Sequence, residues 1–197
     1  MQERAARTRQ DLICAAAREF DRNGYAGSSL ADITRSAGIS MGALTFHFRS
    51  KQDLAAEVRA EGQAATLAVV GRVAERREDP VRSVVSLTVA LAELLEQDVA
   101  VRAAARLARE QPGVGPDWSA TWAPVIQEHL GRTGAGRSGP AADRTVLATL
   151  ADYLLLGAED RARRQAGRPD ALDDRTAGTL ARIWEIALRG LATESHS

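Results

Sequence analysis

Small and hydroxyl-bearing side chains gather at residues 38–43, in the run GISMGA, and the chain's one lysine follows at Lys51. On a helix, Gly42 and Ala43 would allow the backbone to approach the floor of the DNA major groove, where the Ala43 methyl could meet a thymine methyl. Lys51 stands near a predicted helix start, where its charge adds to the positive end of the helix dipole and favours a phosphate. The chemistry indicated is binding of double-stranded DNA.

Two short helices and a turn must position these residues. Ser29 and Asp32 have the spacing of a capping box, which predicts a helix start. Gly38 supplies the left-handed backbone that ends this helix, and Ser40 caps the next, which runs from about Met41 to Phe48. The second helix is too short and too poor in apolar residues for a core element. Two helices joined in this way place the second in the major groove.

A longer helix on either side completes the predicted N-terminal head. One spans about Arg7 to Asn23, with its apolar residues at helical spacing and Gly24 as its C-terminal cap. The other begins at a capping box formed by Ser50 and Asp53 and ends near residue 74. Phe46 and Phe48 are predicted to pack in the core of the head, because an intact duplex offers no exposed base faces for stacking.

Composition supports an all-α fold of about nine helices. Hydrophobic residues make up 45% of the chain, and no alternating strand pattern is present. Residues 1–52 carry 8 Arg or Lys and 5 Asp or Glu, a local charge of +3 in a chain whose total is zero. A basic N-terminal part suits phosphate binding confined to one end. We therefore predict a DNA-binding domain at 1–52 and a ligand-binding and dimerisation domain at 53–197.

Five further helices are predicted in the second domain, at about 81–96, 99–110, 117–130, 142–165 and 172–191, with a glycine-rich loop at 131–140. The last two are the most apolar, and each has too many apolar residues to keep one face exposed to solvent. They would form either a monomeric core or, as we expect, a surface that pairs with its copy as a four-helix bundle.

A mostly apolar ligand site is predicted in the same domain. Trp118 and Trp122 stand four residues apart on the predicted 117–130 helix and would share a face. Thr88, Gln127 and Tyr153 could present polar atoms inward beside them. Ordinary packing would also explain the two tryptophans.

Other classes of protein find little support. The chain has three His and shows no HExxH, CxxC, Walker or GxGxxG arrangement, so we expect no catalysis, metal or cofactor. No apolar run approaches the ~20 residues of a bilayer span. The N-terminus lacks an apolar signal core, and a lone Cys14 forms no intrachain disulfide. These features predict a cytoplasmic protein.

The run GISMGALTFHFRSKQDL resembles the helix-turn-helix signature of the TetR family of bacterial transcriptional regulators, over roughly residues 7–60. The wording GALTFHFRSKQDLA, with RLARE at 106–110, is similar to γ-butyrolactone receptors of actinomycetes, and WAPVIQEHL resembles the stretch in which those receptors carry a ligand-contacting Trp, here Trp122. The resemblance implies base-edge or backbone contacts by Ser40, Gly42 and Ala43, and phosphate contacts by Thr45, His47 and Lys51. Ser29 and Met41 complete the predicted set. The family usually has Tyr where this chain has Thr45.

These features together predict a dimeric repressor of a palindromic operator, released by a small, mostly apolar effector such as a lactone- or furan-type signal. The expected mechanism is a population shift that changes the spacing of the two recognition helices. The alternatives are a constitutive DNA-binding regulator without an effector, and a helical interaction module that no longer binds DNA.

Overall fold

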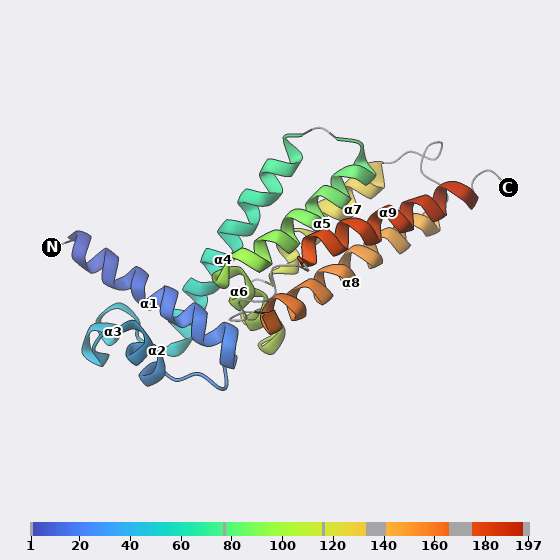
Figure 1. The fold of residues 1–197 in the computed structure, drawn as a ribbon. Helices are drawn as coiled ribbons and strands as arrows, with labels where there is room; N and C mark the ends of the chain where they lie inside the picture. Colours follow the sequence, from blue (N-terminus) through green and yellow to red (C-terminus); the bar gives the residue numbers. More distant parts are fainter. Residues whose placement is uncertain (1, 77, 116, 133–140, 166–174, 195–197) are drawn as a thin grey trace. The chain divides into compact units, whose positions relative to one another are not determined.

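The structure, a computed structural model, describes residues 2–76, 78–115, 117–132, 141–165 and 175–194 (Figure 1). These residues form nine α-helices, one 3-10 turn and no strands, which confirms the predicted all-α fold. The helices are α1 (Gln2–Asn23), α2 (Leu30–Ala37), α3 (Met41–His47), α4 (Lys51–Ala74), α5 (Pro80–Gln97), α6 (Val99–Glu110), α7 (Ala123–Arg132), α8 (Ala141–Gln165) and α9 (Thr176–Glu194), with the 3-10 turn at Ser119–Thr121.

The chain divides into two compact units, and each unit contains segments that are distant in sequence. Unit 1 comprises residues 1–65 and 98–120, and unit 2 comprises residues 66–97 and 121–197. The long helix α4 contributes its first part to unit 1 and its second part to unit 2. The chain therefore passes between the units three times. The predicted functional division between residues 52 and 53 concerns what each part binds, and it stays a prediction.

Unit 1 is built around α1, whose buried face is rich in alanine and ends at Phe20. It packs against α2, α3 and α6. Small side chains allow close approach elsewhere as well: a Cβ added at Gly62 on α4 would lie 2.8 Å from the Ala100 carbonyl oxygen of α6. The shared core of this unit consists of Leu12, Ile13, Ala15, Ala16, Ala17, Phe20, Ile33, Leu44, Phe48, Leu54, Ala55, Val58, Ala103 and Leu107.

Unit 2 is centred on α5, which packs against α7, α8 and α9. Figure 1 shows α8 and α9 running along α5, with α9 antiparallel to it. The Thr176 backbone N–H at the start of α9 donates to the Glu96 carboxylate near the end of α5 at 2.5 Å. Leu87, Leu91, Leu95 and Trp184 are fully buried in this unit. The burial of these side chains supplies the apolar area that holds α9 on α5.

The predicted helix over 117–130 is wrong in its first part, because α7 begins only at Ala123. The Asp117 carboxylate accepts from the Ser119 N–H at 3.0 Å, and this local bond favours a tight turn at Ser119–Thr121. Pro124 has no N–H to donate, so it fits only the first turn of a helix. Trp118 and Trp122 therefore flank the turn and do not share a helix face.

The predicted glycine-rich loop at 131–140 falls mostly outside the described residues, and its first two residues end α7. The predicted start of the last helix at Leu172 also lies outside them. Within the described residues, no helix combines the length and the apolar composition that crossing a bilayer requires.

Candidate DNA-binding surface

Side-chain caps begin both α2 and α3, and a left-handed glycine forms the turn between the two helices, as the sequence predicted. The Ser29 Oγ accepts from the Asp32 N–H at 3.1 Å, and the Ser40 Oγ accepts from the Ala43 N–H at 3.2 Å. Gly38 has φ 67° and donates its N–H to the Arg35 carbonyl. Because each cap satisfies a backbone donor that the helix leaves unpaired, the turn fixes where α3 begins.

The helix α3 is held from one side. Leu44 and Phe48 are buried in the core of unit 1. Met41, Gly42, Thr45 and Phe46 are exposed, while Ala43 and His47 are half-buried. The predicted outward presentation of residues 41–48 is therefore present, with Phe48 as its C-terminal cap.

The predicted core position of Phe46 is wrong, because 82% of the side chain is exposed. Its ring meets the His47 ring edge-on at a centroid distance of 5.2 Å. Phe46 is two residues from both Leu44 and Phe48, which puts it on the far side of a helix that turns about 100° per residue. The prediction grouped the two phenylalanines by type, whereas helical spacing separates them.

Lys51 is engaged within unit 1. Its Nζ donates to the Tyr25 carbonyl at 2.7 Å and to the Ser28 carbonyl at 2.8 Å, and it lies 4.1 Å from the centre of the Tyr25 ring. These bonds tie the start of α4 to the turn between α1 and α2. An ammonium group has three N–H donors, and Lys51 uses two of them for hydrogen bonds within unit 1.

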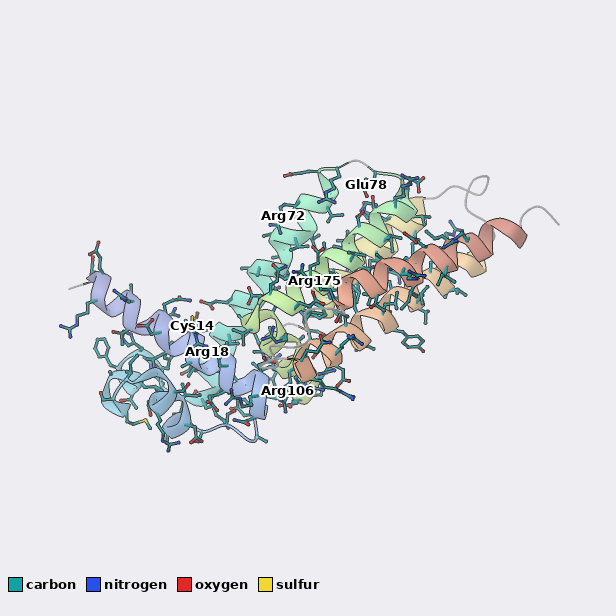
Figure 2. All side chains as sticks on the ribbon, in the orientation of Figure 1. Cys14, Arg18, Arg72, Glu78, Arg106 and Arg175 are labelled. Carbon is teal, nitrogen blue, oxygen red and sulfur yellow. The ribbon has the colours of Figure 1, made fainter. Side chains whose placement is uncertain are left out.

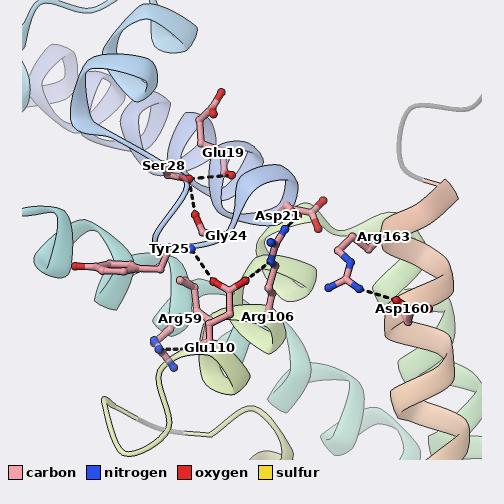
Figure 3. A network of polar contacts seen from close by, with 11 residues as sticks. Glu19, Asp21, Gly24, Tyr25, Ser28, Arg59, Arg106, Glu110, Asp160 and Arg163 are labelled. Carbon is pink, nitrogen blue, oxygen red and sulfur yellow. Dashed lines mark hydrogen bonds and ion pairs between the residues drawn. The ribbon is translucent and has the colours of Figure 1, made fainter.

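The turn at residues 24–28 is held from α6 as well (Figure 3). The Glu110 carboxylate accepts from the Tyr25 N–H at 2.7 Å and pairs with Arg106 at 2.6 Å. Arg106, which Figure 2 labels on α6, also donates to the Asp21 carbonyl at 2.7 Å. Burial would raise the pKa of Glu110, but the Tyr25 N–H and the Arg106 guanidinium outweigh it and hold that pKa below its ordinary value.

Two further arginines, one partly buried and one buried, add to this connection between helices. Arg102 on α6 pairs with the buried carboxylate of Asp21 on α1 at 2.9 Å. Arg59 on α4 donates to the Leu107 carbonyl at 2.7 Å and to the Gln111 amide oxygen at 3.2 Å, at the C-terminal end of α6. Burial lowers the pKa of Arg59, and the nearby charge of Asp117 counteracts this shift. The elements that present α3 are thus fastened to α6 by charged hydrogen bonds, which are stronger than neutral ones.

The predicted ligand-binding residues are not brought together as a group. Thr88 and Trp122 are buried in unit 2, and the Thr88 hydroxyl donates to the Val84 carbonyl of its own helix at 2.7 Å. Trp118 is buried but belongs to unit 1. The predicted inward orientation of Gln127 and Tyr153 is wrong, since both side chains are exposed. The described residues contain no cluster of three His, Cys, Asp or Glu that could hold a metal ion.

A capped turn between two short helices, with small residues facing outward on the second, defines a helix-turn-helix DNA-binding protein. Residues 12–58 match the family model described as bacterial regulatory proteins, tetR family, and the chain resembles the TetR family of regulators. The chain is 29% identical over 196 residues to the A-factor receptor protein of Streptomyces griseus. This match covers 97% of this chain and 66% of that protein. The chain thus spans about two thirds of that receptor's length.

Solved structures show the same likeness over nearly the whole chain. CprB of Streptomyces coelicolor, a TetR family protein in complex with its operator sequence, matches with a TM-score of 0.75 and 28% identity, covering 94% of this chain and 89% of that one. A γ-butyrolactone receptor described as ArpA-like matches with a TM-score of 0.67 and 27% identity, covering 93% of this chain and 99% of that one. These relatives are regulators rather than enzymes.

Proposed function

We propose that this protein is a ligand-responsive transcriptional repressor. It binds a palindromic operator as a homodimer and is released by a small, mostly apolar effector, a γ-butyrolactone or a similar signalling molecule. The observation that carries the proposal is the outward face of α3, a capped helix anchored by Leu44 and Phe48 with Gly42 in open space. A helix presented in this way fits the width of the major groove.

The proposed DNA contacts follow from this placement. Gly42 and Ala43 approach the base edges, with Ser29, Ser40 and Met41 around them, and Thr45 and His47 contact phosphates. The Thr45 hydroxyl donates to the Gly42 carbonyl at 3.1 Å and keeps its oxygen lone pairs. Lys51 has one donor beyond its two bonds to the turn, which is available for a phosphate. Arg49, exposed directly after α3, adds a further charge.

The homodimer is proposed to form through α8 and α9. Their buried residues, such as Leu155 and Trp184, face unit 2, yet the same helices expose a second set of apolar side chains. That second set consists of Val146, Tyr153, Leu156, Ile183 and Ile186. Two helices with an apolar face on each side are what a four-helix interface between two copies requires. Tyr153 belongs to this face, which explains its exposure in a single chain.

Effector binding is assigned to unit 2, where Thr88 and Trp122 are buried. The likeness to γ-butyrolactone receptors supports a lactone-type ligand, and the three chain crossings between the units supply a covalent route for coupling. The ligand would favour a dimer geometry whose recognition helices no longer match successive major grooves, about 34–36 Å apart. The repressor is proposed to act in the cytoplasm.

The test begins with selection of genomic DNA fragments by the purified protein, followed by affinity measurements on the best fragment. We expect a palindromic site and a steep salt dependence. Arg49→Ala should reduce the slope by about 0.9 for each phosphate that the variant no longer neutralises, hence by about 2 for a dimer. Arg72→Ala, on the second part of α4, should leave the slope unchanged. Enrichment of no fragment would overturn the proposal.

The second arm adds a synthetic γ-butyrolactone to the protein–DNA complex. We expect a loss of operator affinity of about 5–150-fold, the range of ordinary allosteric coupling. Unchanged affinity together with unchanged thermal stability would reject the lactone effector and leave a constitutive DNA-binding regulator.

A further inference from the structure

The outermost point of α3 is the aromatic ring of Phe46. Leu44 and Phe48 are four residues apart and share the buried side of the helix. Since each residue advances about 100°, residue 46 lies directly opposite the midpoint between them. The exposed fraction of Phe46, 82%, agrees with this geometry. The side chain that extends farthest from the core on this helix is therefore a large apolar ring.

Small residues surround the base of this ring. Gly42 and Ala43 precede Phe46 by four and three positions, so all three share the outward face. A Cβ added at Gly42 would meet no atom within 4 Å. The ring itself is supported by the edge of His47 at 5.2 Å with an interplanar angle of 83°. The outward face thus consists of small residues and one large aromatic side chain, Phe46, whose ring contacts His47.

An exposed phenyl ring contributes little burial energy to unit 1, and on the outward face of α3 the ring is accessible to a partner. The ring carries no hydrogen-bond donor or acceptor, which rules out recognition of phosphates or of polar base edges. In the major groove, the apolar group that distinguishes one base from the others is the thymine C5-methyl group. Exposed cations are present on α2 at Arg35, which pairs with Asp32 at 2.7 Å, and after α3 at Arg49. Cations of this kind complement the phosphates that border the groove.

We propose that Phe46 is a specificity-determining residue that recognises thymine in the operator through its C5-methyl group. This proposal rests on the proposed function, because it requires α3 to enter the major groove of DNA. It goes further by naming one base type and one chemical group that the protein reads. In a dimer, the contact occurs once in each half-site.

The test replaces each thymine of the selected fragment by deoxyuridine, which differs only in lacking the methyl group. At one symmetric pair of positions, the unaltered protein should lose affinity. Burial of one methyl is worth about 0.8 kcal/mol, which converts to about fourfold per half-site and about 15-fold for both. Phe46→Ala should bind the thymine fragment more weakly and should no longer discriminate thymine from uracil at that pair.

Two control variants separate this contact from other effects. Leu67→Ala removes a half-exposed apolar side chain from α4 and should leave both affinity and uracil sensitivity unchanged. Ala43→Gly removes the other methyl on the outward face that a thymine could meet. Phe46→Ala should retain its thermal stability, because the ring is exposed, and a melting curve checks that the variant is folded.

Each outcome decides a different claim. If the unaltered protein binds the fragment but no thymine-to-uracil change weakens it, the Phe46 proposal is wrong and the proposed function stands. If Phe46→Ala still discriminates thymine from uracil and Ala43→Gly does not, Ala43 is the residue that recognises the methyl group. The Phe46 proposal is then overturned as well. If the unaltered protein enriches no DNA at all, the proposed function itself fails.

Discussion

At the scale of single residues, Gly24 is constrained both by its own backbone and by its neighbours. It ends α1 with φ 73° and donates its N–H to the Phe20 carbonyl at 2.9 Å. A Cβ at this position would lie 2.7 Å from the Arg106 guanidinium and even closer to the Glu110 carboxylate. Both the left-handed backbone and the packed carboxylate therefore favour glycine.

Replacing Gly24 by alanine should destabilise the protein by about 1–3 kcal/mol, since left-handed strain adds to displacement of the Glu110 pair. The matched control is Gly71→Ala, in the interior of α4 with nothing within 4 Å of the added methyl. Helix propensity predicts that this control stabilises the protein by about 0.5–1 kcal/mol. Urea unfolding measures both changes, and two changes of the same sign would contradict the argument.

Residue-level prediction succeeded where a local rule fixed the answer. The caps at Ser29 and Ser40 and the left-handed Gly38 follow from side-chain chemistry within four residues, and all three are present. Phe46 and Tyr153 were misplaced because their orientation depends on which face of a helix the rest of the protein covers. A seven-residue helix offers too few apolar positions to define that face from sequence.

At the scale of elements, α6 and α4 both bind the turn between α1 and α2. Glu110 on α6 accepts from the Tyr25 N–H, and Lys51 at the start of α4 donates to the Tyr25 and Ser28 carbonyls. Within unit 1, the segment that follows the recognition helix and the helix α6 thus share one anchor, residues 24–28. A change in α6 would act on this turn through the Tyr25 N–H.

The Glu110 anchor predicts a pH dependence. A carboxylate whose pKa is lowered in the folded state stabilises that state above its unfolded pKa of about 4.3, and the stabilisation is lost as the pH falls through the folded pKa. Glu110→Gln should cost about 1–2 kcal/mol at pH 7, discounted for a side chain that is one-third exposed, and should make the loss of stability in acid shallower.

Thermal melts from pH 7 down to pH 3 test this expectation. The control is Glu93→Gln, which removes an exposed carboxylate from α5. Equal melting curves for Glu110→Gln and the unaltered protein at every pH would show that the Tyr25 and Arg106 bonds contribute nothing to stability.

Elements were predicted well where caps and breaks marked both ends. The bounds of α6 were predicted as found, because Asp98 caps its start with bonds from Ala100 and Val101, and the Pro112-Gly113 pair follows its end. The start of α7 was missed because the Asp117 side chain favours a turn over a helix that periodicity alone would allow. The inclusion of α6 in unit 1 depends on long-range packing against α1, which no local pattern contains.

At the scale of the whole molecule, α8 and α9 expose apolar side chains that no other described part of a single chain covers. Val146, Tyr153 and Leu156 recur at helical spacing on α8, and Ile183 and Ile186 do so on α9. Contiguous exposed apolar surfaces on a water-facing protein mark interaction sites. A symmetric interface uses the same patch on both copies, so each substitution there acts twice.

Ile186→Glu should therefore convert the proposed dimer to a monomer, because each copy would place a charge in an apolar interface. Sedimentation at increasing concentration measures the assembly, and operator binding should weaken at least 100-fold, since a monomer reads only one half-site. Val114→Glu, which charges an exposed apolar residue of unit 1, is the control and should remain dimeric. If Ile186→Glu stays a dimer with full operator affinity, copies of the chain meet through another surface, and the exposed face of α8 and α9 serves a different partner.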